Sequence, residues 1–249
     1  EIVYNFSRAF YSDFSTKCQD VISNIFIFLS NYEIDSNESK YIISSISDKY
    51  GAIFTFAERC YDILSEVLGK DYSEFPNKQI AAMKLFAYCY QGNAVHLTIN
   101  MPDAFFNTII QSGVMESPNQ LVRIVAFNML SSLFKVLATN LNSFQPIIIF
   151  QEIIDSIDAP DDPIVLASKL KAFKYYLKCF DEGDLELIFT NMEEKILELA
   201  QNSIPEQLIH ILGCIEVFLY RIKTASFDNI IEYFLDILKN PNSVPFNIY

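Results

Sequence analysis

Apolar positions recur with helical spacing along much of the chain, and several of the predicted helices begin at a proline. In residues 117–134, "SPNQLVRIVAFNMLSSLF", Ser117 stands at an expected N-cap, Pro118 at the first helical position and Gln120 three residues after the serine. A serine followed three residues later by Glu or Gln is a capping-box pattern, and proline is favoured in the first turn. The segment therefore predicts an amphipathic helix with a defined start.

The same start signal returns at regular intervals, at Pro76, Pro118, Pro163, Pro205 and Pro245. Successive prolines are 42, 45, 42 and 40 residues apart, and Ser36 lies another 40 residues before the first of them. Asp162 is an expected cap, and Ser203 with Glu206 repeats the serine-and-acid pattern. A start signal that returns every 40–45 residues is typical of two-helix repeats stacked into an array.

A second, shorter apolar helix is expected in each unit. The proline-marked helices are expected near 77–91, 119–139, 164–180 and 206–223, and the shorter ones near 51–68, 103–113, 145–157, 184–201 and 226–239. No segment alternates with a period of two for long enough to predict a strand. The sequence therefore predicts an all-α chain with one domain over 1–249, in which 36–249 are repeats and 1–35 a half unit or cap, within a longer protein. An irregular helical bundle with prolines aligned by chance is the alternative.

Three stretches resemble HEAT and armadillo repeats: "PNQLVRIVAFNML", with Val122-Arg123 followed by Ala126 and Leu130, "IIDSIDAPDDPIVLASKLKAF" and "IIEYFLDILKNPN". The resemblance implies a right-handed α-solenoid of about five stacked two-helix repeats. It also implies that the second helices line a concave face. No other unit has an arginine at the place of Arg123, so the choice between HEAT and armadillo stays open.

Charge divides between the two sets of helices. The net charge is −13, yet the four proline-marked helices carry ten basic and two acidic residues, and the partner segments 103–116, 145–158, 184–202 and 226–239 carry thirteen acidic and two basic residues. A positive layer would attract acidic partners. We therefore take as candidate partner-binding residues Arg123, Lys135, Lys171, Lys174, Tyr175, Lys178, Tyr220 and Arg221. The alternative is an ordinary solvated face, with several cations offsetting helix dipoles at C-termini.

Motifs for chemistry are few. His210 and Cys214 are four residues apart, half of a metal site, but no second pair completes it. There is no glycine-rich phosphate loop, G-x-S-x-G or H-E-x-x-H. The five cysteines are scattered without a CxxC pair, which favours a reducing compartment, cytoplasm or nucleus. The longest apolar stretches fall short of the roughly 20 residues that span a bilayer. We expect no catalysis, metal, cofactor or membrane.

These observations favour a non-catalytic scaffold or adaptor that binds another protein along its concave helical surface, with an acidic peptide or segment as one candidate. Nucleic acid is a less favoured partner, because the chain is acidic overall and lacks RRM, KH and zinc-finger motifs. A nuclear-transport-type receptor, or a regulatory region of a larger protein, is the other alternative.

Overall fold

The computed structural model describes residues 23–24, 26–27, 54–69, 75–98, 102–140 and 147–239. Within these ranges the chain forms nine α-helices and three short 3₁₀ helices, with no strand. The all-α prediction is therefore confirmed for this part of the protein. Apart from residues 23–24 and 26–27, the expected half unit at 1–35 lies outside the described residues, as do the start signals at Ser36 and Pro245.

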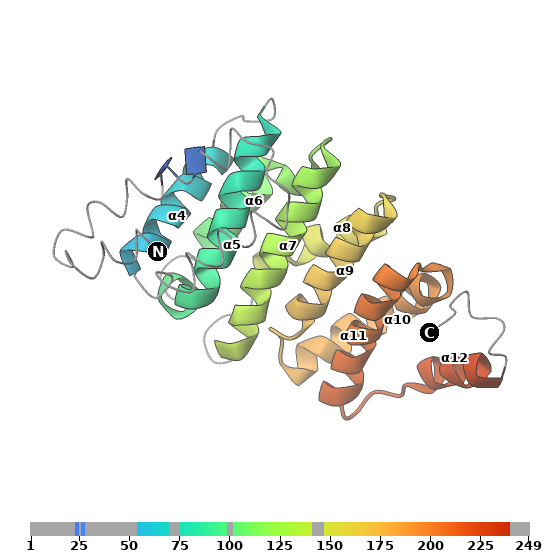
Figure 1. Ribbon diagram of the computed structural model, residues 1–249. Coiled ribbons are helices and arrows are strands. Elements are labelled where there is room, and N and C mark those ends of the chain that lie inside the picture. Colours follow the sequence, from blue (N-terminus) through green and yellow to red (C-terminus); the bar gives the residue numbers. More distant parts are fainter. Residues whose placement is uncertain are drawn as a thin grey trace, which may run out of the picture.

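The proline-marked helices lie side by side in one row. The row consists of α5 (Pro76–Thr98), α7 (Gln120–Leu137), α9 (Pro163–Leu177) and α11 (Pro205–Arg221), each packed against the next (Figure 1). We refer to these four as the helix row. Neighbours in the row are one unit apart in sequence, so the 40–45-residue spacing of the start signals corresponds to a step from one helix to the next.

The other five described helices alternate with the members of the row along the chain. They are α4 (Phe54–Leu68), α6 (Pro102–Ser112), α8 (Phe150–Asp158), α10 (Glu182–Asn202) and α12 (Asp228–Lys239). The expectation that these helices are shorter is wrong for α10, which has 21 residues and is longer than α7, α9 and α11. In the view of Figure 1, α6, α8 and α10 lie behind the helix row, and α12 lies beyond α11. Their bounds agree with the predicted ranges to within a few residues, except that 145–157 is divided into a 3₁₀ turn and α8.

Hydrogen bonds between neighbours in the row repeat the same sequence step. Cys179 Sγ donates to the Phe134 carbonyl, 45 residues earlier, and Gln207 Nε2 donates to the Pro163 carbonyl, 44 residues earlier. Arg221 Nη1 donates to a carbonyl 43 residues earlier, that of Lys178. The periodicity of the sequence is therefore also a periodicity of contacts.

Buried aromatic rings join the two sets of helices. Phe134 of α7 lies 5.9 Å from Phe106 of α6 and 4.8 Å from Tyr176 of α9, measured between ring centroids. Tyr176 in turn lies 6.3 Å from Phe150 of α8. Phe106, Phe134 and Tyr176 are at most 2 % exposed. Burying such side chains supplies about 1.5–3 kcal/mol each, which holds the row on the helices behind it.

Two expected helix caps are wrong in detail. Asn119, rather than Ser117, caps α7, and its Oδ1 accepts from the Leu121 and Val122 amides. Ser203 is buried, and its hydroxyl donates back to Ala200, while Gln207 Oε1 accepts from the Ile204 amide at the start of α11. At both helix starts the oxygen of an Asn or Gln side chain, and not a serine hydroxyl, accepts hydrogen bonds from backbone amides. The cap at Asp162 is confirmed, because its Oδ1 accepts from the Ile164 amide.

Helix α7 is long and apolar enough, by length and composition alone, to cross a membrane. Of the residues of α7, 56 % are buried within the protein, where the helix packs between α5 and α9. Such burial is typical of the core helix of a folded domain.

Candidate partner-binding groove

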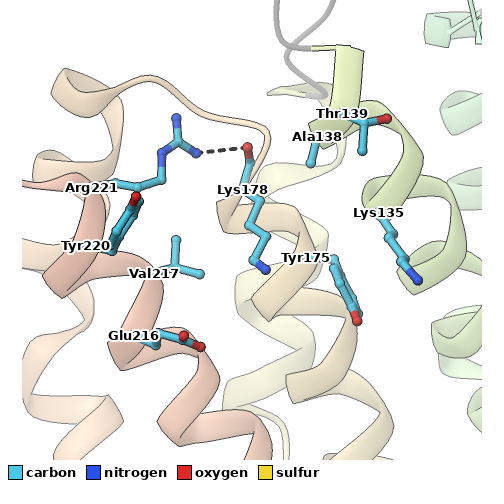
Figure 2. A pocket seen from close by; sticks show the side chains of 9 residues that line it. All are labelled: Lys135, Ala138, Thr139, Tyr175, Lys178, Glu216, Val217, Tyr220 and Arg221. Carbon is cyan, nitrogen blue, oxygen red and sulfur yellow. Dashed lines mark hydrogen bonds between the residues drawn. The ribbon is translucent and has the colours of Figure 1, made fainter.

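A groove of about 430 Å³ runs across the C-terminal ends of α7, α9 and α11. Its walls are formed by Lys135, Ala138, Thr139, Tyr175, Lys178, Glu216, Val217, Tyr220 and Arg221 (Figure 2). Five of the eight sequence-predicted residues line it: Lys135, Tyr175, Lys178, Tyr220 and Arg221. The remaining three, Arg123, Lys171 and Lys174, do not.

The three cations of the groove occupy the same place in successive units. Lys135 lies in the last turn of α7, Lys178 is the C-cap of α9 and Arg221 ends α11, so that 43 residues separate each from the next. Because the helices of the row are parallel at this end, residues one unit apart come together. A helix C-terminus has a partial negative charge that favours a nearby cation, which explains why each unit places one here.

Tyr175 provides the aromatic wall between two lysines. Its half-buried ring lies 4.7 Å from Lys174 Nζ and 5.5 Å from Lys178 Nζ, measured to the ring centroid. Such cation–π contacts contribute roughly 0.5–1 kcal/mol at exposed sites. Tyr220, on the opposite wall, is 86 % exposed. The two rings and the apolar side chains of Val217 and Ala138 line the groove together with its charged side chains.

Arg221 links the two helices α9 and α11 that form one side of the groove. Its guanidinium donates to the carbonyls of Lys178 and Phe180, at the C-terminal end of α9 (Figure 2 draws the first bond). Both carbonyls lie just after Leu177, the last residue of α9, so Arg221 connects the end of α9 to α11. The ammonium groups of Lys135 and Lys178 are therefore the better placed to meet a ligand.

Four groove residues were not predicted from the sequence: Ala138, Thr139, Glu216 and Val217. Ala138 and Thr139 belong to a 3₁₀ turn that extends α7, and Val217 is a buried core residue. Glu216 places one carboxylate among the cations. The signal that could have found them is the 43-residue step itself, which brings the ends of successive helices together.

Arg123 belongs to an internal ion-pair network. Its Nη2 lies 2.8 Å from Asp161 Oδ1, and the buried Lys169 places Nζ 2.9 Å from Asp161 Oδ2. Lys169 Nζ also donates to the Ser156 carbonyl at 2.7 Å. Burial alone would raise the pKa of Asp161, but hydrogen bonds from Lys169 and Arg123 outweigh burial and lower this pKa to about 2. The network ties α7 to the turn before α9.

Lys171 and Lys174 contact neighbouring helices of the row. Lys171 Nζ donates to Asn128 Oδ1 of α7 at 2.9 Å. The stem of Lys174 lies over Gly213 of α11, where a Cβ would overlap Lys174 Cδ. Arg123, Lys171 and Lys174, which were predicted to bind a partner, thus contact neighbouring residues within the protein. The candidate partner-binding surface therefore consists of the groove.

His210 and Cys214 are both shifted toward their neutral forms. Burial, and then the charges of Lys174 and Lys171, lower the pKa of His210 to about 4. Burial raises the pKa of the Cys214 thiol to about 12, against the smaller opposing effect of Lys174. A nucleophilic thiol needs a lowered pKa, so this environment is that of packed side chains. Among the described residues, no group of three or more His, Cys, Asp or Glu side chains could hold a metal.

No known protein family, curated protein or solved structure matches this chain. The groove and the helix row therefore provide the evidence on which a function is proposed.

Proposed function

We propose that this chain is an α-solenoid of HEAT or armadillo type that acts as a non-catalytic scaffold of the cytoplasm or nucleus and binds a partner protein along the helix row. The groove across the C-terminal ends of α7, α9 and α11 is the observation that carries the proposal. The repeated hydrogen bonds, 43 to 45 residues apart, support a stacked array.

The ligand of the groove is an acidic segment with one aromatic or large aliphatic side chain. A volume of about 430 Å³ accommodates one such side chain between Tyr175 and Tyr220. The ammonium groups of Lys135 and Lys178 stand at the rim, where they pair with carboxylates on either side of that anchor. Tyrosine and arginine are enriched in interface hot spots, and the groove has Tyr175, Tyr220 and Arg221.

Binding to a fluorescein-labelled synthetic peptide tests this function. The probe has twelve residues with a central Phe flanked by Asp and Glu, and matched peptides replace the Phe by Ala or the acids by Lys. We expect fluorescence anisotropy to show saturable binding of the acidic Phe peptide and weaker binding, by about tenfold or more, of both matched peptides.

The protein variants are chosen to separate the groove from the overall charge. Lys135→Glu with Lys178→Glu should weaken binding by at least about tenfold. Lys195→Glu with Lys239→Glu, which replaces two surface lysines of α10 and α12 and changes the net charge equally, should leave binding unchanged. Equal losses in both proteins would mean that net charge governs binding and would contradict a groove. A single-stranded RNA that binds more tightly than the peptide, with a steep dependence on salt, would favour the nucleic-acid alternative.

A further inference from the structure

A second cavity lies near the start of α7, away from the groove. Its volume is about 850 Å³. Its lining comes from the end of α6, the 3₁₀ helix Val114–Glu116, α8, the turn before α9, and one cation each of α7 and α9, and every lining residue belongs to the described ranges. Arg123 of this cavity precedes Lys135 of the groove by twelve residues, which is about 18 Å along a helix.

Two walls of the cavity carry acidic residues. Gly113 has a positive φ of 65°, a conformation that glycine adopts readily, and it turns the chain from α6 into the 3₁₀ helix that carries the exposed Glu116. The other acidic wall is α8, with Glu152 and Asp155. These two residues are three apart, so they lie on the same side of the helix.

The two cations of the lining are already neutralised inside the protein. Arg123 and Lys169 both pair with Asp161, at 2.8 Å and 2.9 Å. Each also donates to a backbone carbonyl. Both cations are therefore held by groups of the protein itself, and Asp161 is balanced by them.

The remaining carboxylates of the lining have no cationic partner among the described residues. They are those of Glu116, Glu152 and Asp155. Lys195 of α10 pairs with Asp158 at the end of α8 and does not line the cavity. Glu152 Oε2 is shielded from solvent and accepts no hydrogen bond, which is unfavourable for a carboxylate oxygen. The terminal torsion of a glutamate is broad, so this oxygen can turn toward a donor in the cavity.

The lining also has an apolar part. Ile110, Met115, Ala159 and Pro160 all contribute to it. Arginine and lysine side chains have an aliphatic stem that packs on apolar surface and a charged head that stays with polar groups. A guanidinium also presents five donors in a planar fork that matches carboxylates. Carboxylates without cations, beside an apolar surface, are therefore complementary to an arginine side chain.

We propose that this cavity binds an arginine side chain of a partner protein. The guanidinium pairs with Glu152 and Asp155 of α8, and the aliphatic stem packs on Met115 and Pro160. The volume is about twice that of the groove, so the residues beside the arginine also enter. The inference rests on the proposed protein-binding function, but the cavity shares no residue with the groove, so that either site can fail alone.

Two short synthetic peptides test the cavity. Both are acetylated and amidated and have a central residue flanked by glycine and alanine; this residue is arginine in one and citrulline, which has the same shape without the charge, in the other. With the full 249-residue chain, isothermal titration calorimetry should detect saturable binding of the arginine peptide. The citrulline peptide should bind at least about tenfold more weakly, a comparison that needs no variant of the protein.

Matched variants then locate the site. Glu152→Gln with Asp155→Asn should weaken binding of the arginine peptide by about tenfold or more. Glu194→Gln with Glu232→Gln, which replaces exposed glutamates of α10 and α12 and changes the net charge equally, should bind as the wild type does. Glu152 Oε2 has no donor to lose, so the urea midpoint of the first variant should not fall. Circular dichroism checks that both variants have the helical content of the wild type.

Four results would overturn the proposal. They are the absence of saturable binding of the arginine peptide, equal binding of the citrulline peptide, equal losses in the two double variants, and displacement of the arginine peptide by spermidine at lower concentration than by unlabelled arginine peptide. The last would show a site for a free polyamine. The acidic Phe peptide is titrated in parallel: if it binds and the arginine peptide does not, the cavity proposal fails while the proposed function stands.

Discussion

Replacing Asp161 by Asn should destabilise the fold more than any comparable change on the surface. Asp161 pairs with Arg123 at 2.8 Å and with Lys169 at 2.9 Å, and the three side chains are 10 %, 18 % and 4 % exposed. Asn keeps the shape of the side chain but removes the negative charge, so that a buried lysine loses its counter-ion. Losing one partner of a buried ion pair costs about 3–5 kcal/mol.

The expected loss is smaller than that full range, about 2–3 kcal/mol, because two of the contacts survive. Lys169 Nζ keeps the Ser156 carbonyl and Arg123 keeps the Ser117 carbonyl. Urea unfolding at pH 7, followed by circular dichroism, measures the loss as a midpoint lower by about 1 M. The control is Asp158→Asn, because Asp158 is 53 % exposed and pairs with Lys195 at 3.5 Å; it should cost below about 1 kcal/mol.

The dependence on pH distinguishes the ion pairs from a loss of packing. The folded pKa of Asp161, about 2, lies below the unfolded value of 3.8, so the carboxylate stabilises the protein above pH 3.8 and this stabilisation disappears as the pH falls toward 2. The linked contribution is about 2–2.5 kcal/mol. The gap between wild type and Asp161→Asn should therefore narrow below pH 4. A cost under about 0.5 kcal/mol at pH 7, or a gap that is constant down to pH 2, would refute the reasoning.

Three further predictions concern contacts of α11. Gly213→Ala should lower the free energy of unfolding by about 1 kcal/mol, because the new methyl group displaces the Lys174 side chain. In a Lys174→Ala background the same substitution should raise the free energy of unfolding by up to about 1 kcal/mol, because alanine favours a helix more than glycine does. Thermal unfolding of the four proteins measures both effects. Arg221→Ala leaves the two carbonyls just after α9 without their donor, so the free energy of unfolding measured in urea should fall by about 1–3 kcal/mol. A loss as small as that caused by Lys223→Ala would contradict the capping role of Arg221. The pKa of His210 is about 4 in the folded protein and 6.5 in the unfolded chain, so the unfolded chain binds the proton first. The free energy of unfolding should therefore fall as the pH decreases from 6.5 to 4. In His210→Phe the urea midpoint should change less over this pH range.

The helices and their order could be predicted from the sequence because each start is marked locally. Pro76, Pro163 and Pro205 each begin a helix as expected, since proline at the first turn and apolar spacing are properties of a short segment. The capping residues were less predictable. Asn119 and Ser117 are two residues apart and both suit an N-cap, and only the path of the backbone decides which side chain reaches the free amides.

Five of the nine residues that line the groove were predicted from the sequence, and four were not. Lys135, Lys178 and Arg221 were predicted because basic residues gather on the proline-marked helices. Their position at helix C-termini, which was the basis of the alternative explanation, is also what brings them together in successive units. The sequence does not reveal which cations are used inside the protein. Lys169 and Lys171 are two residues apart on one helix. Lys169 is nevertheless buried and pairs with Asp161, whereas Lys171 donates a hydrogen bond to Asn128 of α7. These contacts depend on how the helices pack, which a local sequence pattern does not show.

The central claim, that the ends of α7, α9 and α11 form a binding groove, is tested most directly by nuclear magnetic resonance titration of the labelled chain with the acidic Phe peptide. The account predicts saturable shifts in the amide signals of Thr139, Lys178, Val217 and Tyr220, which line the groove, and little change along α10. Shifts centred on α10, or no shifts at peptide concentrations well above that of the protein, would contradict it.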